Sequence, residues 1–149
     1  MVDSAQAVRN LLGEYCEHMD LGDFDAVGAL FEHAALADEH GTELARGAGA
    51  VAAFFRAGTQ LHDGSPRTKH LVLNTILDVD EAAGTAGARS SYLVLQATAG
   101  TELRPIITGR YRDAFARDGT TWHFSERRFL VDLVGDLSAH LRFELPPPG

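Results

Sequence analysis

HLVLNTILDV (residues 70–79) opens a series of four long segments in the second half of the chain, and these segments decide the fold class. They are rich in β-branched and aromatic residues, a composition typical of strands. Short links with turn residues separate them, so we expect successive strands to pair antiparallel. The other three segments are AGARSSYLVLQAT (86–98), LRPIITGRYRDAFAR (103–117) and TTWHFSERRFLVDLV (120–134).

The first half of the chain has the apolar periodicity of helices. Apolar residues from Val8 to Met19 recur at three- and four-residue spacing, which places them on one helix face. Further helices and a hairpin follow, bounded by capping residues and glycines. The first helix is expected from a cap at Asp3 or Ser4 to just before Gly22, further helices over 23–31 and 48–61, and the hairpin over 35–47. Helices first and strands afterwards predict an α+β fold in a single domain, residues 1–149, with helices covering one sheet face.

Composition and charge exclude several classes of protein. The chain of 149 residues has a formal net charge of −8 and its 13 basic residues are scattered, so we expect neither nucleic-acid nor membrane binding. No apolar run approaches the roughly 18 residues of a membrane-spanning helix, and the N-terminal residues lack the apolar stretch of a secretory signal. Cys16 is the only cysteine, which excludes an internal disulfide and favours a cytoplasmic location.

Signals for a metal or a cofactor are weak. His33, Asp38, Glu39 and His40 could suggest a metal site, but their spacing matches no ligand pattern. The sequence also lacks a phosphate-binding loop and a dinucleotide fingerprint. We therefore expect no metal and no cofactor.

Four stretches carry a resemblance to a known family. They are YCEHMDLGDFDAVGALF (15–31), SPRTKHLVLN (65–74), GRYRDAF (109–115) and WHFSERR (122–128). In their order and spacing they resemble the SnoaL-like family of the NTF2-like superfamily, which includes scytalone dehydratase and the bile acid 7α-dehydratase. The resemblance covers roughly residues 5–142. It implies a cone-shaped fold, in which a curved antiparallel or mixed sheet wraps around N-terminal helices and encloses an apolar pocket.

His70 is the first candidate for chemistry. By strand alternation it shares a face with Val72, Asn74 and Ile76, as the one titratable group there. Imidazole has an unperturbed pKa of about 6.5, so it suits a general base in a pocket. The residues alone equally allow a histidine at a strand start that bonds a loop carbonyl. The resemblance favours the base, because the dehydratases place their catalytic histidine in a matching TKHLV-type position.

Two residues of the first helix are candidate catalytic partners of His70. Taken alone, Asp20 is a helix-end carboxylate and Tyr15 a core residue with its hydroxyl at a polar rim. The resemblance implies that Asp20 orients His70, since both dehydratases have an aspartate there. The bile acid enzyme also has a tyrosine at the spacing of Tyr15, where a phenol could bind a substrate carbonyl. Scytalone dehydratase has its tyrosine where this chain has Met19, which favours the bile-acid-like or another SnoaL-like geometry.

Arg128 is the candidate for binding an anionic or carbonyl group of the substrate. It alternates with Trp122 and Glu126 on the last strand, and enters the cavity if Trp122 faces the helices. A surface ladder of charges is at least as compatible with the residues, and a bulge would exchange Arg128 for Arg127. Ser91 stands where both dehydratases have a further polar catalytic residue, and this mismatch argues against a dehydratase. The remaining residues expected to line the pocket are Met19, Phe55, Asn74, Tyr111 and Trp122.

These expectations combine into a leading hypothesis of a cofactor-independent lyase or isomerase. It would act as a dehydratase or cyclase on a hydrophobic, oxygenated small molecule such as a polyketide or a steroid-like ring. His70 would be the base, Asp20 its orienting acid, and Tyr15 with Arg128 would stabilise the oxyanion. The alternative is a non-catalytic ligand-binding or assembly module, similar to the small subunit of ring-hydroxylating dioxygenases. Epoxide opening is a third option, but no second acid has a strong claim to it.

Two further expectations concern surfaces. Leu71, Leu73, Thr75 and Leu77 are expected on the outer sheet face, which would be too apolar for solvent. This face predicts a homodimer or a homotrimer. The C-terminal LPPPG (145–149) is expected to be extended and to be loose at its end.

Overall fold

The computed structural model describes residues 2–147 and has the α+β architecture expected from the sequence. The helices are α1 (Ser4–Leu21), α2 (Phe24–Leu30) and α3 (Ala48–Gly58). The strands are β1 (Ala35–Ala37), β2 (Glu43–Arg46), β3 (Thr68–Asp80), β4 (Thr85–Gln96), β5 (Arg104–Asp118) and β6 (Thr121–Val134). Helix α3 ends at Gly58 and not at Leu61, because Thr59 leaves the helix to form a bridge with Leu141.

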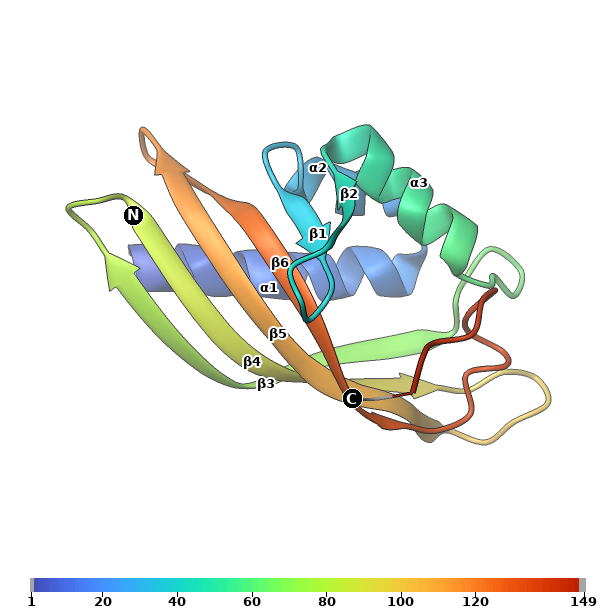
Figure 1. Cartoon of the computed structure of the whole chain (residues 1–149). Coiled ribbons are helices and arrows are strands. Elements are labelled where there is room, and N and C mark those ends of the chain that lie inside the picture. Colours follow the sequence, from blue (N-terminus) through green and yellow to red (C-terminus); the bar gives the residue numbers. More distant parts are fainter. Residues whose placement is uncertain (1, 148–149) are drawn as a thin grey trace.

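The six strands form one sheet in the order β2-β1-β6-β5-β4-β3. The four long strands pair antiparallel in chain order, as predicted, and the short β1 joins β6 in parallel. The sheet curves around α1, while α2 and α3 lie at one end of the molecule (Figure 1). This curvature leaves room for a cavity between the helices and the concave face.

Helix α1 begins and ends at residues that satisfy its free backbone groups. The Asp3 carboxylate accepts a hydrogen bond from the Gln6 amide at 2.7 Å, which caps the start. Gly22 ends the helix in the left-handed conformation, with φ of 70°, where its amide donates to the Met19 carbonyl. The buried face of α1 includes Tyr15 and Met19, and α1 packs against β3 and β6. The last turns of α1 therefore deliver their side chains to the concave side of the sheet.

A bulge in β3 reverses the strand alternation after Leu73. The register shifts between Leu73 and Ile76, and Asn74 has a positive φ of 56°. Beyond the bulge Thr75 faces inward, where its hydroxyl lies 3.1 Å from that of the buried Ser90. The expectation that Asn74 lines the pocket is therefore wrong, because the bulge leaves this residue exposed.

The same bulge changes the outer face of the sheet. Leu77 packs against the core together with Val79, so the prediction that Thr75 and Leu77 face outward is wrong. Ile76 takes an outward position instead and is 53% exposed, and Leu73 is 42% exposed. The outer face of β3 thus still carries exposed apolar side chains, but they belong to a different set of residues.

A second bulge lies in β6, at Ser125. Ala114 of β5 is opposite Glu126, whereas the next residue, Phe115, is opposite Phe124, so that Ser125 is the extra residue. The bulge turns Arg127 into the interior, where it is fully buried and directly opposite Asp113. The expectation that Arg128 enters the cavity is therefore wrong.

None of the helices in the described part of the chain is long and apolar enough to cross a membrane. Helix α1, the longest, carries polar residues along its outer face. This agrees with its place as a helix packed on one side of a curved sheet.

Candidate active site

A cavity of about 790 Å³ lies between the helices and the concave face of the sheet. Its wall is mostly apolar and aromatic, with a few polar groups, which is the usual character of a small-molecule site. Helix α1 contributes Tyr15 and Met19, and α3 contributes Phe54 and Phe55. The strands contribute His70, Tyr92, Val94, Ile107, Tyr111, Phe129 and Val131.

Asp20 and His70 form a hydrogen-bonded pair at the cavity wall. The His70 ring nitrogen Nδ1 lies 2.6 Å from Asp20 Oδ1, and the side chains are only 6% and 14% exposed for His70 and Asp20. The same carboxylate accepts hydrogen bonds from the His70 amide at 2.9 Å and from the Thr68 hydroxyl at 3.0 Å. A carboxylate at Nδ1 fixes the proton on that nitrogen. Nε2 therefore carries the lone pair and is the nitrogen left for a ligand.

Tyr15 lies beside this pair on the cavity wall. Its ring meets the His70 ring edge to face, with centroids 6.3 Å apart, and the Tyr111 ring in the same way at 6.0 Å. Burial raises the pKa of the Tyr15 phenol, and the nearby positive charge of Arg127 opposes this shift. Tyr15 is therefore a neutral hydroxyl group that can donate a hydrogen bond.

Arg127 places a buried positive charge behind the two tyrosines. Its guanidinium carbon lies 3.7 Å from the ring centroid of Tyr111 and 4.3 Å from that of Tyr15. Two hydrogen bonds join it to the Asp113 carboxylate, at 2.7 and 2.9 Å. Burial lowers the pKa of Arg127, but Asp113 outweighs this effect and raises the pKa above its ordinary value. Arg127 thus stays charged without lining the cavity.

Arg128, which was the expected cavity residue, lies on the other face of β6. Its side chain is 43% exposed and forms a salt bridge with Glu126 at 2.6 Å. A charged pair on an accessible face is the arrangement that the residues alone also allowed. The sequence could not decide between the two arginines, because the bulge at Ser125 has no glycine or proline to indicate it.

Tyr92 is a cavity residue that sequence analysis missed. Its ring stacks on Tyr111 with centroids 4.5 Å apart, and burial raises its pKa to about 12. A Cβ atom at Gly109 would collide with the Tyr92 hydroxyl and with the Leu130 carbonyl, so only glycine fits there. Ser91, the neighbouring residue that we had selected, is on the opposite face of β4 and does not line the cavity.

The remaining predicted lining residues divide into two groups. Met19, Phe55 and Tyr111 line the cavity. Trp122 does not, although it is buried, because it lies near the start of β6, where the Arg117 guanidinium packs over its ring at 5.3 Å. The side chain thus belongs to the core near the β5–β6 turn and not to the site.

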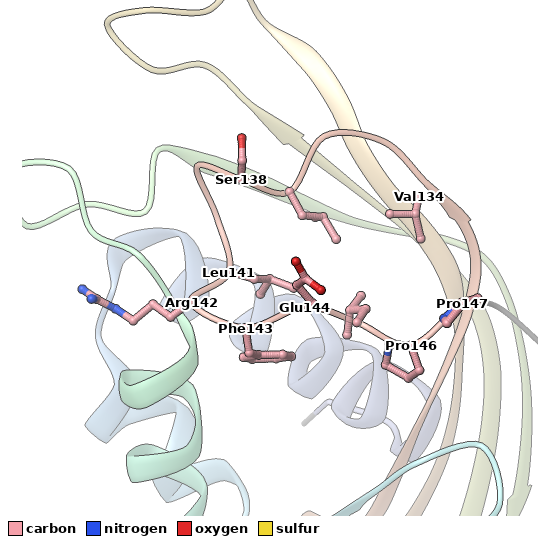
Figure 2. Close-up of a pocket in the computed structure, with 10 residues that line it drawn as sticks. Val134, Ser138, Leu141, Arg142, Phe143, Glu144, Pro146 and Pro147 are labelled. Carbon is pink, nitrogen blue, oxygen red and sulfur yellow. The ribbon is translucent and has the colours of Figure 1, made fainter.

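The segment after β6 crosses the cavity and closes part of it. Figure 2 shows it running from Ser138 past Arg142 and Phe143 to Pro146 and Pro147, beside the strands. Gln60 Nε2 ties it to the end of α3 by donating to the carbonyls of Ser138 and Leu141 at 2.8 and 2.7 Å. Residues of this segment that line the cavity are Leu137, His140, Leu141, Phe143, Leu145, Pro146 and Pro147.

Residues 145–147 of the C-terminal LPPPG line the cavity, while residues 148 and 149, where the tail was expected to be loose, lie outside the described part. This segment and Val134 line a second hollow, of about 530 Å³, and Figure 2 draws the side chains that surround it. Tyr15 and His70 line the larger cavity but not this hollow, and Asp20 reaches the larger cavity only through its hydrogen bond to His70. The larger cavity is therefore the candidate site.

Comparison with known proteins agrees with the fold. Three solved structures from Novosphingobium aromaticivorans share the fold, which defines an NTF2-like, cystatin-like protein. The first is an NTF2-like protein with 23% sequence identity and a TM-score of 0.69, and the match covers 91% of this chain and 85% of the other. The second is a candidate scytalone dehydratase with 20% identity and a TM-score of 0.67, matched over 89% of this chain and 86% of the other. The third is the beta subunit of a candidate aromatic-ring-hydroxylating dioxygenase with 20% identity and a TM-score of 0.65, matched over 86% of this chain and 88% of the other. Residues 1–128 match the SnoaL-like domain family, and the chain belongs to this family. No curated protein matches the chain.

Proposed function

We propose that this protein is a lyase or isomerase that moves a proton on a hydrophobic, oxygenated small molecule. The observation that carries the proposal is the Asp20–His70 pair, with Nδ1 held at 2.6 Å and Nε2 left for the aromatic cavity. A neutral imidazole oriented by a carboxylate is an effective general base near neutral pH.

In the proposed reaction His70 Nε2 removes a proton from a carbon α or vinylogous to a carbonyl group. The Asp20 carboxylate stabilises the imidazolium that forms and keeps the ring in place. The electron pair moves to the carbonyl oxygen, to which the Tyr15 hydroxyl donates a hydrogen bond. The intermediate then loses hydroxide, which leaves as water with the proton from His70, or it takes the proton back at another carbon. The first outcome is a dehydration and the second an isomerisation. A cyclisation would follow if the enolate carbon instead attacked a second carbonyl carbon of the same molecule, whose C=O π bond breaks as the new carbon–carbon bond forms and whose oxygen then takes the proton from His70.

Arg127 would assist from behind the tyrosines. Its charge is 4.3 Å from the Tyr15 ring centroid, in an environment from which water is excluded. A fixed positive charge in such an environment favours negative charge that develops nearby. This charge would strengthen Tyr15 as a donor without touching the substrate.

A second candidate function is that of a non-catalytic assembly module. It is favoured by the apolar side chains of Leu73, Ile76 and Leu133, which are exposed on the outer face of the sheet, and by the likeness in fold to a dioxygenase beta subunit. In that case Asp20 and His70 would be only a buried hydrogen-bonded pair. A homodimer or homotrimer through this face is compatible with either function, and light scattering that shows a stable monomer would exclude it.

Deuterium exchange into a hydrophobic ketone tests the proposed base without knowledge of the natural substrate. Proton NMR would follow the loss of the α-protons of 2-tetralone in D₂O, with and without the protein. We expect the wild type to accelerate this exchange, and His70→Asn to reduce the acceleration by about 10²- to 10⁴-fold. The matched control is His33→Asn, which changes an exposed histidine away from the cavity. Equal acceleration by wild type and a folded His70→Asn variant would exclude His70 as the base.

A further inference from the structure

A second histidine, His140, lines the same cavity from the segment after β6. Its ring centroid lies 6.4 Å from that of His70, with the two ring planes inclined at 63°. The residue is only 6% exposed. Sequence analysis did not select it, because an irregular segment has no periodicity from which the direction of a side chain follows.

The position of His140 is fixed by backbone hydrogen bonds on both sides. The Gln60 amide donates to the His140 carbonyl at 2.8 Å, and the His140 amide donates to the Leu137 carbonyl at 2.9 Å. The bridge between Thr59 and Leu141 adds a further connection to the end of α3. His140 is therefore held by the scaffold of the cavity and is not a side chain of a loose tail.

The two ring nitrogens of His140 differ in their surroundings. Nδ1 is buried and has no hydrogen-bond partner among the residues that the structure describes. A buried N–H without an acceptor is rarer in proteins than a buried acceptor without a donor. The proton is therefore expected on Nε2, with the bare lone pair on Nδ1. Nε2–H is then the group through which the ring can bond a ligand in the cavity.

His140 and His70 thus present opposite hydrogen-bonding groups to one space. Asp20 gives His70 a lone pair at Nε2, whereas His140 has no carboxylate on its ring among the described residues. Burial is the main cause that lowers the pKa of His140 to about 4, and the neighbouring His70 acts in the same direction. His140 is therefore a neutral donor at neutral pH, next to a ring that accepts.

We propose that His140 is a further substrate-binding residue, which donates a hydrogen bond from Nε2 to a ligand oxygen that lies between the two imidazole rings. This inference rests on the proposed function, because it takes His70 Nε2 to be the acceptor. Hydrogen bonds of about 2.9 Å allow a single oxygen to meet both rings when the centroids are 6.4 Å apart. The ligand class is then a hydrophobic molecule with a hydroxyl or enol group, whose O–H donates to His70 while its oxygen accepts from His140.

The test compares two probes that differ in one group. 2-Naphthol carries a hydroxyl where 2-methylnaphthalene carries a methyl group of similar size, and fluorescence would give both affinities. We expect wild type to prefer 2-naphthol, and His140→Phe to reduce this preference about three- to tenfold, which corresponds to one lost hydrogen bond. Unchanged binding of 2-methylnaphthalene would show that the variant cavity is intact. His140→Gln retains an N–H donor and should recover part of the preference.

The outcomes separate this inference from the proposed function. A preference that disappears in His70→Asn but is unchanged in His140→Phe would overturn the role of His140 and leave His70 in place. A preference lost in His140→Phe but kept in His70→Asn would speak against His70 as the acceptor. ¹⁵N NMR of the imidazole rings gives a readout without a ligand. It should find His140 neutral at pH 7 with its proton on Nε2, and a proton on Nδ1 would overturn the inference.

Discussion

Two buried pairs lie within the curved sheet, and they differ in what they leave free. Asp113 and Arg127 are both completely buried and joined by two hydrogen bonds, so that no ligand can reach them. Asp20 and His70 are nearly as buried, but the carboxylate bonds only one ring nitrogen and leaves the other for the cavity. The first pair supplies a fixed charge and the second a group that can exchange a proton. Burial of a hydrogen-bonded pair with a carboxylate alone therefore does not identify a catalytic site.

Removal of one member of the completely buried Asp113–Arg127 pair should have the largest effect on stability. Arg127→Leu leaves the Asp113 carboxylate buried without a partner, and breaking a buried pair in this way typically costs about 3–5 kcal/mol of unfolding free energy. Urea denaturation at pH 7 would measure the loss. The double variant Arg127→Leu/Asp113→Leu removes both charges and should recover most of it. If Arg127→Leu alone were as stable as wild type, Asp113 and Arg127 would not be a buried charged pair.

His140, an unpaired histidine beside the paired His70, should make stability depend on pH. Its folded pKa of about 4 lies below the unfolded value of 6.5, so the unfolded state binds more protons between these values. This contribution to stability is complete above about pH 6.5 and is lost as the pH falls to 4, by up to about 3 kcal/mol. The other groups that act on His140 are Asp20, His70 and His62.

Urea denaturation of wild type and His140→Phe at pH 7.5 and 4.5 isolates this contribution. The variant should lose less stability than wild type between the two pH values, because Phe does not titrate. Equal losses in both proteins would contradict the assigned pKa of His140.

Substitution in the Asp20–His70 pair should change activity more than stability. Asp20→Asn removes the charge that stabilises the His70 imidazolium, and we expect exchange into 2-tetralone to fall about 100-fold. The amide keeps hydrogen-bonding capacity toward the His70 amide, so the unfolding free energy should change by only about 1 kcal/mol. A large loss of stability with full activity would place Asp20–His70 in the same class as Asp113–Arg127.

The smallest effect on exchange is expected from Tyr15→Phe. Tyr15 lies between the two pairs, because its ring contacts both His70 and Arg127. The variant keeps the aromatic contacts to His70 and Arg127 but removes the donor for the carbonyl oxygen. Exchange should fall about tenfold, with little change in the melting temperature. Exchange at the wild-type rate would remove Tyr15 from the mechanism.

The sequence predicted the architecture well because its signals are local. Helix periodicity before Gly22 and long β-branched segments after His70 define the elements, and short turns define the pairing of the strands. The resemblance to SnoaL-like proteins predicted that Asp20 contacts His70, and the structure places the two within hydrogen-bonding distance. Their catalytic roles stay predictions.

The errors in the predicted site arise where local signals end. The bulge at Asn74 and the bulge at Ser125 each shift a strand by one residue, which sends Asn74 outward and Arg127 inward. Neither bulge contains a glycine or a proline, so alternation alone could not reveal them. His140 was missed for a related reason, because its direction depends on the bonds between the last segment and α3.

The extra residue in β6 has a consequence for how relatives of this chain should be compared. A relative that lacks a counterpart of Ser125 would have a strand of uninterrupted alternation, in which Phe124 and Arg127 still share the inner face. A relative with the full length but no bulge would turn the second arginine of the Arg-Arg dipeptide inward instead. In a sequence alignment, the placement of a gap at this single position thus decides which of the two adjacent arginines is structurally equivalent between family members. Identity of the aligned residues alone does not decide it.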